Sequence, residues 1–429
     1  MKKMTDEKYL KRIFQAYYKE QQSEIPLVNL YEQREFGFIP WEKLIMIRHI
    51  GFNSSVNLKK YFINNTPKHA YASGSLYLQP ENQDMLGKGY QGCDLIFDID
   101  VDHFYTPCKE DHDIWYCKEC GENGRGMVQK CPKCGKLKLK KITWICEDCL
   151  DAAKNEIIKL IYNFLIPDFN INIENMKIAF SGHRGYHLKI EDEKIRTLTS
   201  DERREIVDYM TGENISFEIL GLQEKGGNIF GFSRKTIGWP QKIINKIESI
   251  LKKSNVEIET LLSEKRTYNL SQNYMENFLN FKENFLNIIE SDNNNNWTLV
   301  GFTFNAWIKF LRTIVSELGI EVDIPVTIDT RRLIRYPGSL HGTTGFKVQE
   351  INHDDLDLFN PLDESNEKLD PIVFKSENII TQKIEIIETK IPATKIKGET
   401  FGPYTQGEKI EVPHHIAVFL LCKGVAKTI

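Results

Sequence analysis

The chain has 429 residues, of which 41% are hydrophobic and 27% charged, an ordinary globular composition with room for two domains or one large one. Its 56 Lys and Arg residues are balanced by 60 Asp and Glu residues, so the formal charge of −4 excludes an argument for nucleic-acid binding from overall basicity. The longest apolar run, Ile416 to Cys422, is far shorter than the roughly 18 to 20 residues that cross a bilayer. We expect an intracellular, cytoplasmic protein with no membrane partner.

The first half of the chain predicts helices around a β-rich stretch. A helix is expected over 6–21, and aromatic and β-branched residues predict strands over 69–78 and 93–102. Apolar residues at helical spacing predict a second helix at about 150–165, followed by a short strand over 176–182. The expected fold class is therefore α/β (α+β).

The second half begins with helices and returns to strands. Between about 197 and 318 the pattern is helical, with Ser200 as the expected N-cap of the first helix. Strand texture returns at 320–328 and 345–351, and a final apolar helix is predicted at 416–425. The α/β core is thus expected to form from two separated stretches of chain.

Nine cysteines are the most informative count in the composition. Seven of them fall between Cys108 and Cys149, and they include three CxxC pairs. Thiols stay free in a reducing compartment, and the two-residue spacing lets both sulfurs of a pair reach one tetrahedral ion. Zinc is the expected ion. Cys93 and Cys422 stand apart and are expected to be buried small apolar residues.

Two acids lie close together in the predicted strand over 93–102. Asp98 and Asp100 are two residues apart, so their carboxylates point to the same face, about 6–7 Å apart. Two acids on one face are costly unless a cation neutralises them, which Mg²⁺ or Mn²⁺ bridged by carboxylates and phosphates would do. The alternative is a solvated acidic face, because Asp94 and Asp102 share the same parity.

The segment SGHRGYH follows a predicted strand and favours an anion. Its two glycines allow a tight turn and close approach of the backbone to a ligand. Arg184 offers a planar fork for phosphate oxygens, and Ser181 and His187 add polar groups beside it. Turns of this kind also occur on ordinary protein surfaces.

A second basic segment, RRLIRYPGSLHG, follows a candidate third acid, which is either Asp323 or Asp329 by spacing. The polar members of the segment are Arg331, Arg332, Arg335, Ser339 and His341. The arginines are either phosphate ligands or salt-bridge partners of nearby acids. Paired acids, a glycine-framed Arg/His turn and an Arg/His segment are together the parts of a site for metal-assisted nucleotidyl transfer.

With these motifs in place, the sequence resembles the small, catalytic subunit of archaeal and eukaryotic DNA primases. The similarity is carried by REFGF, IRHIGF, FDIDVDH, SGHRGYH and RLIRYPGSLHGTTG, which follow one another in the family's order. It implies the primase catalytic fold and a two-metal site. It further implies synthesis of short RNA primers, with DNA primers as an option, on single-stranded DNA with a primase large subunit as heterodimer partner. Arg34 and Arg48 lie in these motifs but fit structural ion pairs equally well.

The resemblance also implies roles for individual residues. Asp98, Asp100 and Asp323 would bind Mg²⁺ or Mn²⁺, and Asp323 is favoured over Asp329 because the family's third acid lies well upstream of the histidine in SLHG. The residues implied to contact the incoming nucleoside triphosphate are Ser181, Arg184, His187, Arg335 and His341.

Two Zn²⁺ sites are predicted when His112 is added to the clustered cysteines. The first is a ribbon of two CxxC pairs separated by ten residues, Cys117, Cys120, Cys131 and Cys134. The second is Cys108, His112, Cys146 and Cys149. His103 is a rival for His112, and three cysteines with a water are a further option. Four protein ligands leave no open position, so both sites are expected to be structural.

The position of these sites gives the expected domain organisation. The resemblance implies a Cys/His zinc site near Cys146 and makes the ribbon an insertion. Six lysines between Lys130 and Lys141 form a face that either contacts template phosphates or is simply solvated. The expected division is a primase-type catalytic core over 1–195, including a zinc-binding insertion at 103–149, a helical subdomain over 196–318, the second part of the core over 319–380, and a C-terminal segment over 381–429.

Two other functions compete with the primase. One is a stand-alone primase-like repair polymerase, which the catalytic motifs do not separate from a primase subunit. The other is a non-catalytic zinc-ribbon protein that binds nucleic acid and whose acids are inert.

Overall fold

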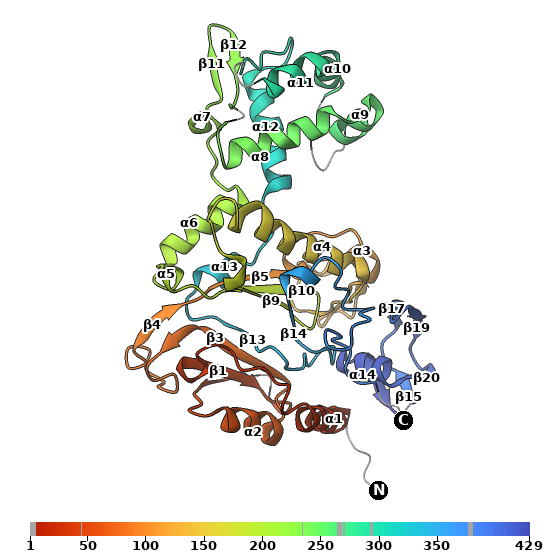
Figure 1. Ribbon diagram of the computed structural model, residues 1–429. Coiled ribbons are helices and arrows are strands. Elements are labelled where there is room, and N and C mark those ends of the chain that lie inside the picture. Colours follow the sequence, from red (N-terminus) through yellow and green to blue (C-terminus); the bar gives the residue numbers. More distant parts are fainter. Residues whose placement is uncertain are drawn as a thin grey trace. The chain divides into compact units, whose positions relative to one another are not determined.

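The computed structural model describes residues 6–43, 45–233, 235–263, 268, 271–291, 295–375 and 381–429. It is a mixed α/β fold with several sheets (Figure 1). Two compact units are distinguished. Unit 1 comprises Met1–Ile161, Ile171–Arg204 and Glu321–Ile429, and unit 2 comprises Tyr162–Asn170 and Glu205–Ile320.

The first sheet of unit 1 is antiparallel, with strand order β13-β3-β1-β2 and with β4 also paired to β3. Its strands are β1 (Arg34–Ile39), β2 (Ile47–Ile50), β3 (His69–Tyr77), β4 (Tyr90–Cys93) and β13 (Leu333–Arg335). Helices α1 (Asp6–Glu20) and α2 (Ser55–Asn65) lie beside one another along this sheet (Figure 1). Their buried residues Phe14, Leu58 and Phe62 contribute to its core.

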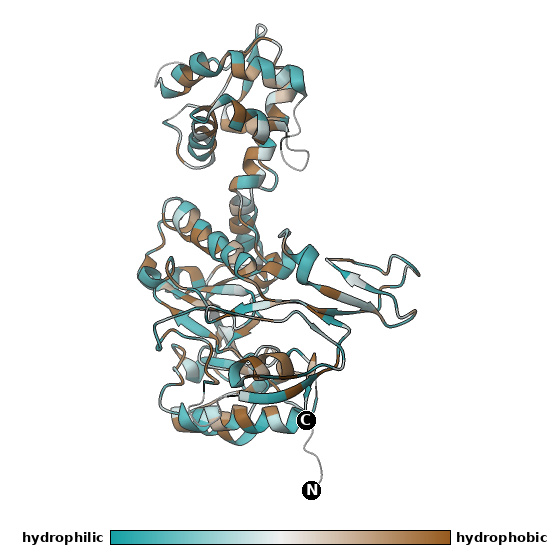
Figure 2. Ribbon diagram, turned by 90° about the vertical axis from the view of Figure 1, so that its right-hand side faces the viewer, coloured by the Kyte–Doolittle hydropathy of each residue, from teal (hydrophilic) through white to brown (hydrophobic). Residues whose placement is uncertain are grey.

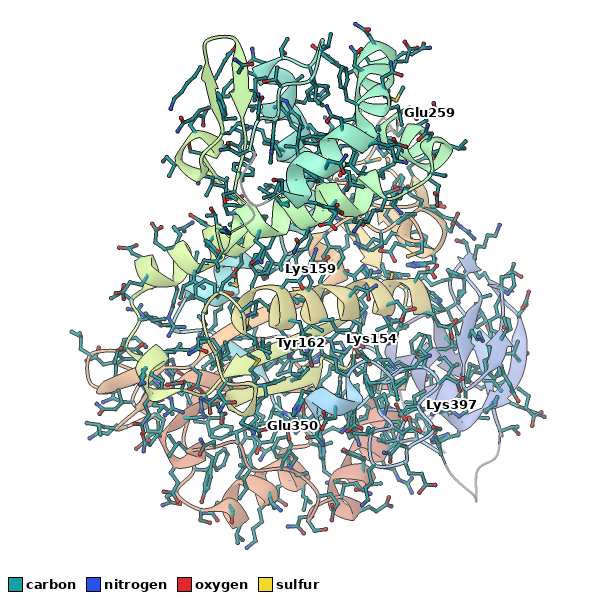
Figure 3. All side chains as sticks on the ribbon, turned by 45° about the horizontal axis from the view of Figure 1, so that its top comes forward. Lys154, Lys159, Tyr162, Glu259, Glu350 and Lys397 are labelled. Atoms are coloured by element: carbon teal, nitrogen blue, oxygen red, sulfur yellow. The ribbon has the colours of Figure 1, made fainter. Side chains whose placement is uncertain are left out.

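The second sheet of unit 1 is also antiparallel, with strand order β14-β9-β10-β5. Its strands are β5 (Leu95–Asp100), β9 (Met176–Phe180), β10 (Gly185–Ile190) and β14 (Gln349–Ile351). Helix α4 (Glu147–Lys159) packs on β5 and β10 and continues into a π-helical turn, Leu160–Leu165. Lys154 of α4, labelled in Figure 3, donates hydrogen bonds to the carbonyls of Asp357 and Phe359 at 3.1 and 3.2 Å.

Two smaller parts complete unit 1. A cysteine-bearing lobe contains α3 (Lys109–His112) and a sheet of β6 (Ile114–Cys117), β7 (Asn123–Arg125) and β8 (Leu139–Ile142). The C-terminal part contains β15 (Thr381–Ile386), β20 (Lys409–Pro413), α14 (His414–Cys422) and β21 (Ala426–Thr428). Short hairpins pair β16 (Lys390–Ile391) with β19 (Tyr404–Thr405), and β17 (Thr394–Ile396) with β18 (Glu399–Phe401).

Unit 2 is mostly helical and has its own aromatic core. Its elements are the end of α6 (Ser200–Thr211), α7 (Phe217–Leu220), β11 (Gln223–Lys225), β12 (Asn228–Phe230), α8 (Trp239–Leu251), α9 (Asn255–Ser263), α10 (Gln272–Asn280), α11 (Lys282–Glu290) and α12 (Phe304–Leu318). Trp297 and Phe302 both pack on Trp307, with ring centroids 5.2 and 4.9 Å from the Trp307 centroid. Hydrophilic and hydrophobic residues alternate along the longer helices (Figure 2). Among the described residues, no helix combines the length and apolarity that a membrane span requires.

Several predicted elements are confirmed, and two local predictions are wrong. Helix α1 and strand β3 match the helix predicted over 6–21 and the strand predicted over 69–78. The strand predicted over 320–328 is wrong, because Ile324–Ile328 forms the short helix α13. Pro325 cannot donate to a strand ladder but suits the first turn of a helix.

The N-cap predicted for α6 is also wrong. Thr199, rather than Ser200, makes a capping box, with its hydroxyl accepting from the Glu202 N–H at 3.3 Å and the Glu202 carboxylate accepting from the Thr199 N–H at 2.7 Å.

Arg34 and Arg48, which lie in the N-terminal motifs, are both held in ion pairs. Arg34 is fully buried and binds Asp94 at 2.7 Å, and Asp94 also binds Arg196 at 2.7 Å. The Arg48 Nε lies 2.8 Å from Glu35. Both arginines therefore have a structural role in unit 1.

Arg34→Met is expected to destabilise the protein by about 3 to 5 kcal/mol, because it removes one partner of a fully buried ion pair and leaves Asp94 short of a counter-charge. Urea denaturation of wild type and variant measures the loss. The control is Lys11→Met, whose pair with Glu42 is exposed and is worth at most about 1 kcal/mol. Equal losses in the two variants would contradict this account of Arg34.

Candidate active site

Two neighbouring strands, β5 and β10, bring the paired acids and the Arg/His turn together. In their antiparallel register His187 lies opposite Asp98, and Gly185 lies opposite Asp100. The His187 Nε2 is 3.4 Å from an Asp98 carboxylate oxygen. The two motifs, far apart in the sequence, therefore form one site.

The turn that joins β9 to β10 depends on glycine at two positions. Gly182 has a φ of +80°, which an L side chain rarely adopts. A Cβ on Gly185 would lie 2.3 Å from the carbonyl oxygen of Ile99 on β5. Only a residue without a side chain therefore lets β10 lie this close to β5, and the Ser181 N–H closes the turn on the Gly185 carbonyl at 2.9 Å.

The structure places Asp323, and not Asp329, beside the paired acids. Asp323 precedes α13, and its N–H donates to the Asp98 carbonyl at 2.9 Å. Its carboxylate lies 3.5 Å from the Nε2 of His103. Asp329 is at the other end of α13, where its carboxylate accepts from the Arg331 N–H at 2.9 Å and lies 3.5 Å from Arg332.

Burial and neighbouring carboxylates raise the pKa values of Asp98 and Asp100. Burial raises the pKa of Asp98 to about 8, and the neighbouring carboxylates of Asp100 and Asp323 add to the effect. Burial and the Asp102 carboxylate raise the pKa of Asp100. Acids in this state favour a divalent cation, because the cation removes the repulsion that disfavours their charged forms.

The alternative of a solvated acidic strand face is wrong. Asp94 is fully buried between Arg34 and Arg196. Asp102 has left the strand, since the chain turns into a 3₁₀ helix at Val101–His103. The row of acids along one strand is therefore limited to Asp98 and Asp100.

A cavity of about 450 Å³ opens beside these acids. Its lining includes six of the predicted site residues, Asp98, Asp100, Ser181, His187, Arg335 and His341. Candidate metal-binding carboxylates and candidate phosphate ligands thus border one hollow of a size suited to a small molecule.

The histidines of the cavity are neutral, and Arg335 supplies charge. Burial lowers the pKa of His187 to about 3, with the Arg335 charge adding to the shift, and burial lowers the pKa values of His183 and His341 well below their usual range. The Arg335 Nη1 lies 2.9 Å from the Nδ1 of His69. Within the described ranges, no carboxylate lies within ion-pair distance of Arg335, so its guanidinium is available to an anion.

Arg184 is placed differently from the other predicted triphosphate contacts. It is 1% exposed, and its guanidinium binds the carboxylates of Asp102 at 2.7 Å and of Asp113 at 2.8 Å. It also donates to the Trp144 carbonyl at 3.0 Å. The structure therefore brings Ser181, His187, Arg335 and His341 to the cavity but turns Arg184 toward two acids.

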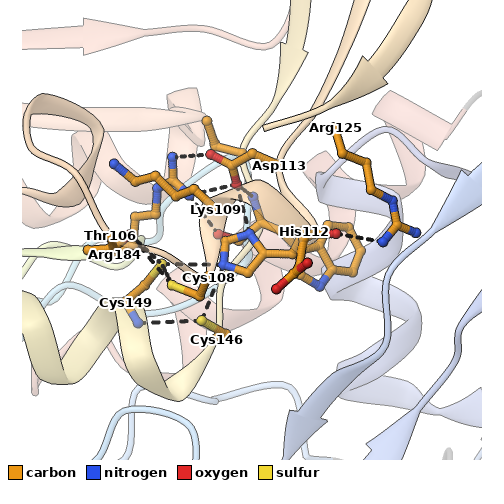
Figure 4. Close-up of polar contacts among 12 residues, drawn as sticks. Thr106, Cys108, Lys109, His112, Asp113, Arg125, Cys146, Cys149 and Arg184 are labelled. Carbon is orange, nitrogen blue, oxygen red and sulfur yellow. Dashed lines mark hydrogen bonds and ion pairs between the residues drawn. The ribbon is translucent and has the colours of Figure 1, made fainter. Parts of the chain in front are cut away.

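Asp113 connects Arg184 to the second predicted zinc group, which contains His112 (Figure 4). Its carboxylate lies 2.9 Å from the Nδ1 of His112, whose Nε2 is 3.2 Å from the Cys146 sulfur and 3.4 Å from the Cys149 sulfur. Burial disfavours the charged form of Asp113, but hydrogen bonds from His112 and Arg184 outweigh this and lower its pKa. A carboxylate that holds the second nitrogen of a ligand histidine is a common support of metal sites.

The structure brings together both predicted sets of thiol and imidazole ligands. In each set the ligand atoms lie within 4.8 Å of one another. The sets are Cys108, His112, Cys146 and Cys149, and Cys117, Cys120, Cys131 and Cys134. His103 faces Asp323 instead of the set that contains His112. The ligand atoms of Asp100, Asp102 and His183 also lie within 4.8 Å of one another, a grouping that the sequence did not predict.

The comparisons with known proteins agree on one family. The family model described as DNA primase small subunit matches residues 129–352. The DNA primase small subunit of Archaeoglobus fulgidus is 31% identical over 97% of both chains, and that of Methanothrix thermoacetophila is 32% identical over 98% of both. The chain belongs to the DNA primase small subunit family. Members of this family are nucleotidyltransferases that synthesise RNA primers.

Three of the six lysines on the basic face of the cysteine-bearing lobe form ion pairs with acids. Lys133 lies 2.8 Å from Glu122, and Lys138 lies 3.2 Å from Glu119. Lys140 also forms an ion pair, with Glu388. The pairs of Lys133 and Lys138 favour a solvated face for that part of the lobe, whereas Lys140 and Lys141 line the cavity.

The cavity residues that were missed in the sequence include His69, His183, Thr343 and Lys423. His183 and Thr343 lie within or beside motifs that had been recognised, so their position was a usable signal. His69 begins an ordinary strand, and Lys423 follows an apolar helix near the end of the chain. Only the tertiary structure brings these last two to the cavity.

Asp98→Asn is expected to stabilise the primase in buffer without added Mg²⁺ or Mn²⁺. Since folding raises the pKa of Asp98 from 3.8 to about 8, the folded state binds a proton that the unfolded chain releases, and stability falls as pH rises from about 4 to about 8. Asn removes this loss. At pH 8 the unfolding midpoint should exceed that of wild type by at least about 2 °C, the shift that about 1 kcal/mol produces in a domain of this size.

The difference in unfolding midpoint between Asp98→Asn and wild type should shrink toward pH 5. Added Mn²⁺ should reverse the sign of this difference, because it stabilises wild type alone. Asp329→Asn, at the exposed end of α13, serves as the control and should show neither effect. A wild-type midpoint equal to that of Asp98→Asn at pH 8 would contradict the repulsion among the acids.

Proposed function

We propose that the chain is the catalytic subunit of a DNA primase that makes short RNA primers on single-stranded DNA by two-metal nucleotidyl transfer. The observation that carries the proposal is that Asp98 and Asp100 line one cavity with Arg335 and His187, while Asp323 is hydrogen-bonded to Asp98. The fold that we propose is a primase-type catalytic core formed from 1–195 and 319–380.

The three acids fit divalent cations as ligands. Oxygen donors are what Mg²⁺ and Mn²⁺ prefer, and the raised pKa values of Asp98 and Asp100 reflect burial and the repulsion of neighbouring carboxylates. When bound, two such ions would activate the primer 3′-hydroxyl and neutralise the triphosphate and its leaving pyrophosphate. The Asp323 backbone is fixed by its hydrogen bond to Asp98, so the third carboxylate is held in place before any ligand binds.

The other side of the cavity is suited to the phosphates of a nucleoside triphosphate. Arg335 contributes a guanidinium that can bind two phosphate oxygens at once. Ser181, His187 and His341 contribute hydroxyl and neutral imidazole groups, which donate hydrogen bonds without adding charge. These groups would stabilise the negative charge that develops on the phosphates in the transition state.

We assign Arg184 a positioning role in place of direct contact with the triphosphate. Its ion pairs with Asp102 and Asp113 fix the turn that carries Ser181 relative to the segment that follows Asp100. Substitution of Arg184 would therefore move these residues and affect catalysis indirectly.

Both ligand sets fit Zn²⁺, since four thiolate or imidazole donors within reach of one point suit a tetrahedral ion. With four protein ligands each, the two zinc sites are structural. The set with His112 supports the active site through Asp113, and the ribbon lies in the insertion at 103–149.

The partners follow from the proposed activity. They are a single-stranded DNA template, nucleoside triphosphates and a primase large subunit, with which the chain forms a heterodimer inside the cell. The helical subdomain at 196–318 and the C-terminal segment at 381–429 complete the domain organisation that we propose. Primer synthesis with ribonucleotides and with deoxyribonucleotides, each with and without the large subunit, tests this. Full activity without binding to the large subunit would favour a stand-alone repair polymerase.

The double variant Asp98→Asn, Asp100→Asn is expected to lose primer synthesis by at least about 100-fold, because the metal-binding carboxylates become neutral amides. Synthesis is measured on single-stranded DNA with Mg²⁺ or Mn²⁺, together with template binding, which should persist. Asp329→Asn is the matched control and should remain active. Retained synthesis in the double variant would contradict the role proposed for these acids, whereas template binding without synthesis by wild type would favour the non-catalytic zinc-ribbon alternative.

Elemental analysis of the purified protein should give about two zinc ions per chain. Cys131→Ser should remove one ion and Cys146→Ser the other. Only Cys146→Ser should strongly reduce primer synthesis, because its group is linked through Asp113 to Arg184. A single zinc ion in wild type would overturn the grouping of ligands.

A further inference from the structure

Lys423 extends from the turn after α14 into the cavity that contains the candidate nucleotide site. Its Nζ donates a hydrogen bond to the Thr143 carbonyl at 2.7 Å and lies 2.8 Å from the Nε2 of His183. The carbonyl is uncharged, and the pKa of His183 lies well below its usual range, so the imidazole is neutral too. An ammonium group is thus held at the cavity by neutral partners.

The charge of Lys423 has no matching carboxylate. In the part of the chain that the structure describes, no Asp or Glu lies within ion-pair distance of its Nζ, although the side chain is largely enclosed. Lysine is seldom enclosed without a partner, because removing its charge from water costs free energy that a nearby anion would offset. Burial and the charge of Arg184 lower the pKa of Lys423 to about 7.

The neighbours of Lys423 indicate what kind of anion would offset this charge. The His183 ring stacks on that of His341, with centroids 5.2 Å apart and planes 15° apart. The Nδ1 of His341 lies 3.0 Å from the hydroxyl of Thr343, and Ser181 also lines this cavity. Hydroxyl and imidazole groups around an ammonium provide several hydrogen-bond donors, as a polyphosphate requires.

We propose that Lys423 binds the phosphates of the incoming nucleoside triphosphate, so that the C-terminal segment completes the nucleotide site. The inference rests on the proposed primase function and adds a residue to its substrate contacts. Lys423 then supplies, together with Arg335, the positive charge that the neutral histidines of the cavity do not.

A purely structural role makes a different prediction. If Lys423 acted mainly as a strut between the C-terminal segment and the Thr143 carbonyl, its loss would lower the unfolding temperature and leave nucleotide affinity unchanged. If it binds phosphate, its loss should leave the free protein as stable as wild type or more so, since an enclosed charge has been removed.

The experiment compares Lys423→Met, Lys423→Gln and Lys423→Arg with wild type in primer synthesis. Gln keeps a donor for the Thr143 carbonyl without the charge, which separates the strut from the phosphate contact and provides a second variant if Met impairs folding. Lys409→Met, an exposed lysine of the same segment outside the cavity, is the matched control.

We expect the Met and Gln variants to raise the KM for nucleoside triphosphates about 10- to 100-fold, the range for a lost hydrogen bond to a charged group. Their unfolding temperatures and zinc content should match wild type, and Arg should restore most of the affinity. The stabilisation of the protein by inorganic tripolyphosphate should shrink in the same order, whereas Lys409→Met should behave as wild type in every assay.

Two failures are distinguishable. If wild type makes primers and the Met and Gln variants have an unchanged KM, the role of Lys423 is overturned and the primase function stands. If wild type makes no primers with either nucleotide set, the proposed function is overturned. The tripolyphosphate measurement then still decides whether Lys423 binds a polyphosphate.

Discussion

The buried guanidinium of Arg184 is the interaction on which the rest of the site depends. It binds Asp102, just after the strand of the paired acids, and Asp113, which belongs to the cysteine-bearing lobe. Arg184 itself lies in the glycine turn before β10. One side chain therefore joins three segments that are distant in sequence, and because two carboxylates face it, its enclosed charge is fully compensated.

This arrangement separates the charges of the molecule into local groups. Asp98 and Asp100 repel each other on one side of the cavity, whereas Arg335 and Lys423 lie at the cavity without carboxylate partners among the described residues. The histidines between them are neutral. A net charge of −4 for the whole chain thus conceals a cavity that is acidic at the proposed cation ligands and basic at the proposed phosphate ligands.

The features that sequence could predict are those set by local periodicity. The common face of Asp98 and Asp100 follows from the two-residue repeat of a strand, and the grouping of thiols follows from CxxC spacing. Spacing alone did not separate Asp323 from Asp329, and the choice of Asp323 came from the resemblance to the family. The residues around Pro325 had predicted a strand, where the structure has the helix α13. The contribution of Lys423 depends on a tertiary contact that no spacing in the chain encodes.

The two motif arginines show why residue type alone does not decide a role. Arg184 and Arg335 both stand in segments that suit phosphate binding, and the sequence assigned both to the triphosphate. Tertiary structure places two carboxylates against Arg184 and none against Arg335 within the described chain. A guanidinium that already has two carboxylate partners gains little from a further anion, because its hydrogen bonds and its charge are engaged. The counter-ions that the fold supplies therefore distinguish Arg184, proposed to organise the site, from Arg335, proposed to bind substrate.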